Sequence, residues 1–131
     1  MKVPHYFIVV DDDPMNNLIC KHIIHKYNGG AEILIFTEPE KALKMIVETF
    51  DGITENPETV LFLDINMPSM NGWEFLNEFE NFTKKIQEQI SIYILSSSID
   101  QSDRDKADIN SLVKGYISKP LSLDLMTEIF A

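Results

Sequence analysis

Short apolar runs alternate along the chain with longer segments that have helical periodicity. Each run is short enough to be a strand that is buried on both faces of a sheet, and each ends at polar residues. The predicted strands are residues 5–10, 31–36, 60–63, 90–95 and 112–117.

The segments between these runs carry apolar residues at helical spacing and recognisable start and stop signals. Residues 14–27 have an apolar stripe, and Asn28-Gly29-Gly30 ends the helix. The stripe consists of Met15, Leu18, Ile19, Ile23 and Tyr27. A second helix begins at the capping-box pattern Thr37-Glu38-Pro39-Glu40 and repeats apolar residues up to Phe50.

Three further helices follow later in the chain. Gly72 precedes a helix with Phe75, Phe79 and Phe82 on one side, and a polar, weakly patterned helix spans residues 100–108. The last helix is capped by Ser122, and its apolar side consists of Leu125, Met126, Ile129 and Phe130. Five strands alternating with five helices predict an α/β fold, with a parallel sheet covered by helices on both faces.

Composition narrows the class of protein. The chain has 131 residues, of which 44% are hydrophobic and 24% charged, as in ordinary globular domains, so we expect a single domain over residues 1–131. The net charge of −10 argues against direct nucleic-acid binding. The lone Cys20 cannot form an internal disulfide, and the apolar run 6–10 is too short for a membrane span or signal peptide. We expect a cytoplasmic protein that makes no membrane contact.

Chemically active residues follow the predicted strands. In folds of this class ligands bind beyond the carboxyl ends of the strands. The residues at those ends are Asp11, Asp12, Asp13, Asp64, Ser96, Lys119 and Pro120. Carboxylates on neighbouring strand ends come within roughly 5 Å and repel by about 3 kcal/mol per pair. Oxygen ligands without His or Cys select a hard cation, and Mg²⁺ is favoured over Ca²⁺ because the loop lacks EF-hand spacing.

Four segments together resemble the receiver domain of two-component response regulators, and the resemblance covers nearly the whole chain. They are Ile-Val-Val-Asp-Asp-Asp at 8–13, Leu-Phe-Leu-Asp-Ile-Asn-Met-Pro through Asn-Gly at 61–72, Ile-Leu-Ser-Ser at 94–97, and Gly-Tyr-Ile-Ser-Lys-Pro at 115–120. The resemblance implies a flavodoxin-like fold with a five-stranded parallel sheet in the order 2-1-3-4-5.

The resemblance also assigns roles at the acidic end of the sheet. Asp64 would accept a phosphoryl group from the phosphohistidine of a histidine kinase. Asp12, Asp64 and the backbone carbonyl of Asn66 would bind Mg²⁺ directly, and Asp11 would act mostly through bound water. Lys119 would pair with the phosphoryl oxygens.

A second set of residues would report the phosphorylation. Ser96 would donate a hydrogen bond to a phosphoryl oxygen, and Tyr116 would swing inward as Ser96 moves. Ser96 stands where threonine is commoner in the family. Pro120 matches a cis-proline position. Asn66 and Ser98 occupy places that tune hydrolysis of the aspartyl phosphate.

The resemblance implies a regulatory phosphoacceptor and not a free-standing enzyme. Its partners would be a sensor histidine kinase or phosphotransfer protein and a downstream protein target. The target would bind the face formed by the fourth helix, fifth strand and fifth helix, which includes residues 100–108, Tyr116 and residues 121–130.

Three other readings start from the same residues. One is a receiver-like binding module that is not phosphorylated, against which the complete acid, hydroxyl and lysine set argues. A haloacid-dehalogenase phosphohydrolase expects Asp-x-Asp at its nucleophile, whereas Asp64 is followed by Ile65-Asn66. A flavodoxin needs a phosphate loop after the first strand, where this chain has three aspartates that would repel phosphate.

Overall fold

The computed structural model describes residues 4–51 and 58–130. The five strands are β1 (Tyr6–Val10), β2 (Glu32–Phe36), β3 (Thr59–Leu63), β4 (Ile90–Ser96) and β5 (Val113–Ser118). The helices in this part of the chain are α1 (Pro14–Tyr27), α2 (Pro39–Phe50), α3 (Gly72–Glu80), α4 (Lys84–Gln89), α5 (Gln101–Ile109) and α6 (Leu123–Phe130).

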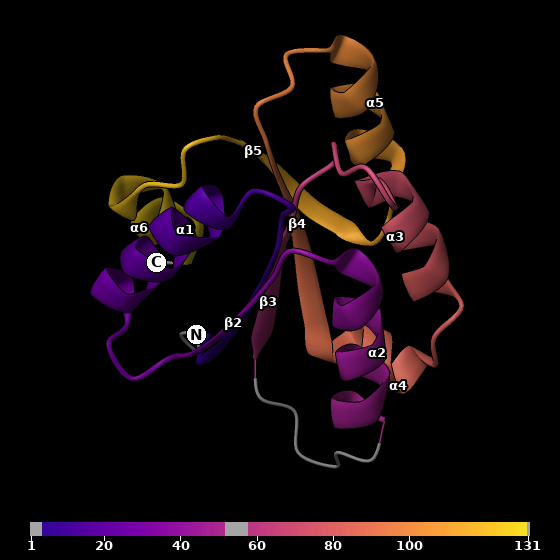
Figure 1. The fold of residues 1–131 in the computed structure, drawn as a ribbon, viewed down its shortest axis with the longest axis horizontal. Coiled ribbons are helices and arrows are strands. Elements are labelled where there is room, and N and C mark those ends of the chain that lie inside the picture. Colours follow the sequence, from indigo (N-terminus) through magenta and orange to yellow (C-terminus); the bar gives the residue numbers. More distant parts are fainter. Residues whose placement is uncertain (1–3, 52–57, 131) are drawn as a thin grey trace.

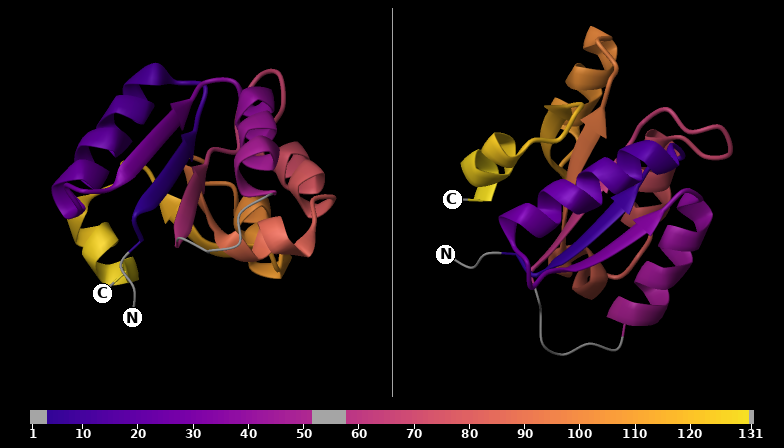
Figure 2. Two further views of the ribbon diagram at one scale, coloured as in Figure 1. Left: turned by 90° about the horizontal axis from the view of Figure 1, so that it is seen from below. Right: turned by 60° about the vertical axis from the view of Figure 1, so that its left-hand side comes forward.

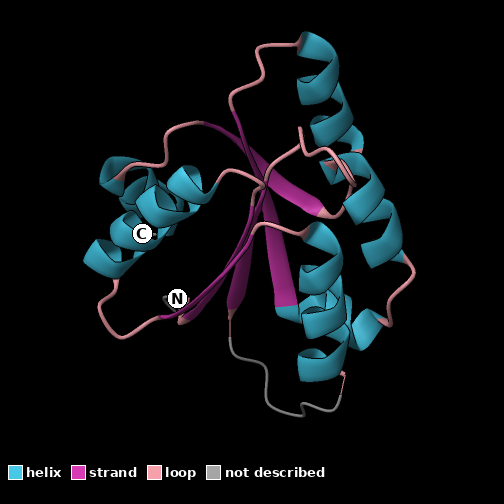
Figure 3. Cartoon of the chain, in the orientation of Figure 1, coloured by secondary structure: helices cyan, strands magenta, loops and turns pink. Residues whose placement is uncertain are grey.

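The strands form one parallel sheet in the order β2-β1-β3-β4-β5, which confirms the predicted fold class. Helices α1 and α6 cover one face, while α2, α3, α4 and α5 cover the other (Figure 1). Two further views show the same separation of the helices into two layers (Figure 2), and the strands lie between these layers (Figure 3). None of the helices among the described residues combines the length and apolar character that a membrane span requires.

Helix α4 is a difference from the sequence-based expectation of five helices. It has six residues, Thr83 caps its first turn, and only Ile86 and Gln89 are buried. So short and polar a segment gives no periodic apolar signal, because its packing depends on a single apolar side chain. As a result, the predicted fourth and fifth helices are α5 and α6.

The helix starts agree with prediction except at α2. Asp13 caps α1 by accepting a hydrogen bond from the backbone of Met15, and Ser122 accepts one from the backbone N–H of Leu125. In α2 the N-cap is Glu38, which makes no side-chain capping bond, so the predicted capping box at Thr37 is wrong. Pro39, with its fixed φ, begins the helix there instead.

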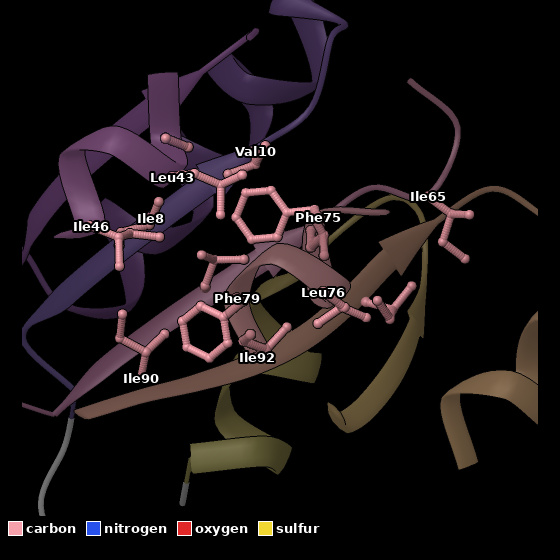
Figure 4. Packing of buried hydrophobic residues seen from close by; sticks show 14 of the residues in the cluster. Ile8, Val10, Leu43, Ile46, Ile65, Phe75, Leu76, Phe79, Ile90 and Ile92 are labelled. Carbon is pink, nitrogen blue, oxygen red and sulfur yellow. The ribbon is translucent and has the colours of Figure 1, made fainter. Parts of the chain in front are cut away.

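Two hydrophobic cores flank the sheet, and alternate residues of each strand point into one or the other. Ile8 and Val10 of β1 face the layer of α2 to α5, whereas Phe7 and Val9 face α1 and α6. Figure 4 shows the rings of Phe75 and Phe79 among the aliphatic side chains of the first core. This period-two alternation fixes the strand register, and with it the positions of the residues that follow the strands.

The apolar stripe that predicts α1 is only partly the buried face of that helix. Met15, Leu18 and Ile19 are 63%, 56% and 40% exposed, whereas Ile23 and Tyr27 are partly buried and pack against the core under α1 and α6. The buried residues are Asn16, Asn17, Cys20 and Ile24. Helix α1 therefore packs on the sheet through a mixed polar and apolar face, and the reason for its polar part lies at the carboxyl edge of the sheet.

Candidate functional site

The strand register brings the predicted residues to one edge of the sheet. Val10 at the end of β1 pairs with Leu63 at the end of β3, so Asp11 and Asp64 follow neighbouring strands at the same level. The backbone N–H of Asp64 donates to the carbonyl of Val10 at 2.9 Å, which continues the pairing beyond the strands. The two carboxylates are therefore held side by side by backbone geometry.

Three carboxylates meet at this edge. Side-chain oxygens of Asp11, Asp12 and Asp64 lie within 4.8 Å of one another. Asp11 and Asp64 are 2% and 5% exposed, whereas Asp12 is exposed to solvent. Three oxygen donors without a nitrogen or sulfur ligand are suited to a hard divalent cation, and the exposed Asp12 leaves that position open to water. The cluster could thus bind a metal, as the sequence predicts.

Lys119 extends from the end of β5 into this cluster. Its Nζ lies 2.6 Å from Asp11 Oδ2 and 3.7 Å from Asp64 Oδ1. Burial of the ammonium group acts to lower the pKa of Lys119, but the hydrogen bond to Asp11 and the charges of both aspartates outweigh it and leave that pKa raised. Lys119 is therefore a fixed positive charge beside Asp64.

Asp64 is poorly suited to carry its charge without a cation. Burial is the main cause that raises its pKa to about 6, and the charge of Asp11 adds to the increase. Lys119 and the backbone N–H groups of Ile65 and Asn66 oppose the shift without cancelling it. The site thus contains more buried negative charge than Lys119 neutralises, which is the electrostatic condition for binding a cation.

Asparagines of α1 hold Asp11 in place. Asp11 Oδ2 accepts from Asn16 Nδ2 at 2.8 Å, Asp11 Oδ1 accepts from the backbone N–H of Asp13 at 2.9 Å, and the carbonyl of Asp11 accepts from Asn17 Nδ2 at 2.9 Å. Sequence analysis missed Asn16 and Asn17. In the sequence the two asparagines stand out only as polar residues that interrupt the apolar pattern of the helix just after the acids. Their contacts with Asp11 explain why part of the buried face of α1 is polar.

Ser96 lies at the end of β4, fully buried. Its Oγ accepts a hydrogen bond from the backbone N–H of Ser98 at 3.1 Å, which leaves the Ser96 hydroxyl proton for another acceptor. Tyr116 OH donates to the carbonyl of Ser98 at 3.1 Å, and the Arg104 guanidinium lies 4.7 Å from the centre of the Tyr116 ring. Both Ser96 and Tyr116, predicted to act as a pair, therefore contact Ser98.

The remaining predicted residues lie around the cluster. Asn66 is exposed, two residues after Asp64. Asp13, whose position before Pro14 predicts an N-cap, caps α1. The Lys119–Pro120 peptide bond is cis, as the resemblance implies. The backbone N–H of Lys119 donates to the carbonyl of Ser96 at 3.0 Å, so β4 and β5 stay paired up to the site.

The fold and this site define a class of α/β protein with an acidic cluster and a lysine at the carboxyl edge of its sheet. A model of the response regulator receiver domain matches residues 7–131, and the chain belongs to this family. Receiver domains are regulatory components of two-component systems and interact with histidine kinases or phosphotransfer proteins.

Relatives of known structure agree with this assignment. A two-component response regulator from Cytophaga hutchinsonii is 28% identical with a TM-score of 0.85, and the match covers 99% of this chain and 96% of that one. A response regulator receiver protein from Dyadobacter fermentans DSM 18053 is 26% identical with a TM-score of 0.84, covering 95% of this chain and 93% of that one.

A curated relative is much longer than this chain. Sensor protein EvgS of Escherichia coli strain K12 is 28% identical over 123 residues, which are 91% of this chain. The chain spans only 9% of the length of that protein.

Proposed function

We propose that this chain is a phosphoacceptor switch that takes a phosphoryl group from the phosphohistidine of a sensor histidine kinase or phosphotransfer protein onto Asp64. The observation that carries the proposal is the buried carboxylate of Asp64, which lies in one cluster with Asp11 and Asp12 and 3.7 Å from Lys119 Nζ. A carboxylate, two neighbouring acids and a lysine provide a nucleophile, ligands for a cation and a charge for a phosphoryl oxygen.

In the proposed reaction an oxygen of Asp64 forms a bond to phosphorus while the bond from phosphorus to the donor imidazole nitrogen breaks. The electron pair of that bond stays on the imidazole, which takes up a proton as it leaves. The transition state is loose, so alignment and charge stabilisation matter more than the basicity of the carboxylate. The backbone N–H of Ile65, which donates to Asp64 Oδ1 at 2.9 Å, holds the nucleophile in position.

The divalent cation would be Mg²⁺, held by Asp12, Asp64 and the backbone carbonyl of Asn66, with Asp11 acting through water. When bound, it supplies positive charge that offsets both the carboxylates and the phosphoryl oxygens. Lys119 supplies the second positive charge, because its Nζ is already close to Asp64. Burial, and after it the charge of Asp11, raises the pKa of Asp64, and a bound cation would offset both effects.

Ser96 and Tyr116 would convert phosphorylation into a change of surface. The hydroxyl of Ser96 would donate to a phosphoryl oxygen, and any movement of Ser96 reaches Tyr116 through their shared partner Ser98. Phosphorylation shifts the equilibrium only by as much as it stabilises one arrangement over the other. The affected surface is the one formed by α5, β5 and α6.

A downstream protein would bind this α5-β5-α6 surface. It has a groove between β5 and α6 whose lining includes Tyr93, Tyr116, Leu125 and Ile129. Aromatic and aliphatic side chains in a groove rimmed by Lys114 and Glu128 are typical of a protein-binding surface. The proposal also includes a single domain over residues 1–131 and a cytoplasmic location, where kinases of two-component systems transfer their phosphoryl groups.

Intact-mass spectrometry tests the proposal directly. The protein is incubated with phosphoramidate and Mg²⁺, and wild type is compared with Asp64→Asn and with the exposed control Asp124→Asn. We expect a mass gain of one phosphoryl group in wild type and control that depends on Mg²⁺ and is absent from Asp64→Asn. The fluorescence of Trp73, the only tryptophan, is followed with beryllofluoride as a second readout.

The alternative of an unphosphorylated binding module predicts a different result. If wild type gains no mass and beryllofluoride with Mg²⁺ leaves Trp73 fluorescence unchanged, the phosphoacceptor proposal is wrong. Pull-down with the unmodified protein is then the way to find its partners.

A further inference from the structure

The carboxylate of Asp103, in the first turn of α5, joins two segments that are far apart in the sequence. Its Oδ2 accepts a hydrogen bond from Ser98 Oγ at 2.7 Å, and its Oδ1 accepts one from Trp73 Nε1 of α3 at 3.3 Å. One side chain therefore ties the loop between β4 and α5 to helix α3. The sequence placed Asp103 only within the predicted binding face, residues 100–108, and gave no sign of its contact with Trp73.

Ser98 also connects Asp103 to the phosphoacceptor site, because it lies two residues after Ser96 in the sequence. The backbone N–H of Ser98 donates to the buried Oγ of Ser96, and the carbonyl of Ser98 accepts from Tyr116 OH. Ser98 is thus held by its backbone to both Ser96 and Tyr116. Its Oγ donates to Asp103 and accepts from the backbone N–H of Asp100 at 3.2 Å. Of these partners of Ser98, Asp103 is the one whose side chain also reaches α3.

Contacts of its neighbours in α5 restrict the position of Asp103. Its neighbour Arg104 stacks on the Tyr116 ring and donates to Ser118 Oγ at 3.1 Å, which holds the first turn of α5 against β5. On the other side, Lys106 Nζ lies 5.7 Å from the centre of the Trp73 ring. The carboxylate is therefore fixed between an anchored helix and a packed indole.

Any acidic residue in the first turn of a helix stabilises it through the helix dipole. The capping function, however, belongs to Asp100, whose side chain accepts from the backbone N–H of Ser102. Asp103 uses both of its oxygens outside its own helix. A purely local role in α5 does not account for that arrangement.

We propose that Asp103 is a positioning residue for phosphoryl transfer, which holds the Ser98 backbone so that the Ser96 hydroxyl is placed to donate to the phosphoryl group. This inference rests on the proposed function, because it assigns Asp103 a part in the reaction at Asp64. The tie to Trp73 makes the indole a reporter of the same connection.

The test compares rates of Asp64 phosphorylation by phosphoramidate, measured by intact mass at fixed Mg²⁺. We expect Asp103→Ala to be slower than wild type by about fivefold to tenfold, as for the loss of one well-placed hydrogen bond. Asp103→Asn retains an oxygen that accepts from Trp73 and offers Ser98 Oγ an N–H donor in place of the carboxylate acceptor. The hydrogen bond to Ser98 is then reversed in direction and not lost, so the rate should remain within about twofold of wild type. Glu78→Ala removes an exposed carboxylate from α3, outside the α5-β5-α6 surface, and serves as the control for charge, with a rate that we also expect within about twofold of wild type.

Two further readouts separate positioning from general damage. Asp103 touches none of the three clustered carboxylates, so Asp103→Ala should bind Mg²⁺ as tightly as wild type. The change in Trp73 fluorescence on adding beryllofluoride should be lost in Asp103→Ala and retained in Asp103→Asn. A rate loss that is matched by an equal loss of Mg²⁺ affinity would overturn the inference.

A double-mutant cycle with Ser98→Ala tests whether Asp103 acts through Ser98. Ser98→Ala alone should slow phosphorylation by a similar factor, and adding Asp103→Ala should cause no further loss. Additive losses, or an Asp103→Ala rate equal to that of Glu78→Ala, would overturn the inference while leaving the proposed function intact. If wild type itself is not phosphorylated, both proposals are wrong.

Discussion

Lys119 Nζ lies closer to Asp11 than to Asp64, at 2.6 Å against 3.7 Å. The sequence places Lys119 at the same sheet edge as both acids, but it does not say which of them the lysine prefers. In the unphosphorylated protein the lysine is therefore mainly the counter-charge of Asp11, with Asp64 as its second neighbour. This pairing of charges predicts measurable effects on the stability of the protein.

Replacing Lys119 by methionine should destabilise the protein in the absence of Mg²⁺ by about 3 kcal/mol, because the buried charge of Asp11 loses its partner. Added Mg²⁺ should stabilise Lys119→Met more than wild type, since the cation replaces the missing positive charge. Chemical denaturation with and without Mg²⁺ measures both effects. Lys114→Met, at an exposed position of β5, is the matched control. Equal responses of the two variants would contradict the assigned role of the pair.

Removing one carboxylate should relieve repulsion in the Mg²⁺-free protein. We expect Asp64→Asn to raise the melting temperature, corresponding to about 1 to 3 kcal/mol, because Asp64 is buried beside Asp11. Asp12→Ala should raise it less, since Asp12 is exposed. Mg²⁺ should stabilise wild type and do little for either variant. Unchanged or lower melting temperatures in both variants would count against the carboxylate cluster.

Stability in the absence of Mg²⁺ should depend on pH through Asp64. Its pKa is raised from 3.8 to about 6 in the folded protein, so between these values the folded state binds more protons than the unfolded state. This contribution to stability is therefore fully present below the lower value and is lost as the pH rises through about 6.

The measurement compares wild type with Asp64→Asn. Going from about pH 7.5 to about pH 4.5, wild type should gain about 2 kcal/mol in the free energy of unfolding relative to the variant. Denaturation curves at several pH values give this difference. A difference that is independent of pH would show that Asp64 titrates near its ordinary pKa.

Gly72, which begins α3, has no room for a side chain. A Cβ at this position would lie 2.7 Å from the backbone oxygen of Asp64 and 2.9 Å from Ile65 Cα. Gly72→Ala should therefore destabilise the protein by about 1 to 3 kcal/mol and slow phosphorylation, because the backbone that carries Asp64 must shift. At Gly29 the nearest atom would be 3.8 Å away, so Gly29→Ala is the control. Measuring the thermal stability and phosphorylation rate of both variants tests this prediction.

The exposed part of the α1 stripe, Met15, Leu18 and Ile19, should tolerate polar residues. Leu18 is 56% exposed, so Leu18→Gln should change stability by less than about 0.5 kcal/mol, whereas Ile24→Ala should cost about 2 to 5 kcal/mol because Ile24 is fully buried. Denaturant titration of both variants tests this. A large loss in Leu18→Gln would mean that the stripe is packed after all.

The sequence alone predicted all five strands within a residue or so of their ends, because strands buried on both faces form unbroken apolar runs bounded by polar residues. The residues after those runs therefore located Asp11, Asp64, Ser96 and Lys119 at one edge. Helix α4 escaped prediction because a short polar helix has no periodic signal. The buried face of α1 was missed, because apolar spacing does not mark its asparagines, which are buried to bind the backbone and side chain of Asp11.

The five strands, five of the six described helices, the family and the residue types at the sheet edge thus follow from local pattern and motif. Which charges pair and which polar groups form hydrogen bonds depends on the tertiary structure. The preference of Lys119 for Asp11 and the bridge from Ser98 through Asp103 to Trp73 join residues that are distant along the chain. Hydrogen bonds depend on distances of a few tenths of an ångström and on direction, which sheet register and helix packing set together and no local pattern records.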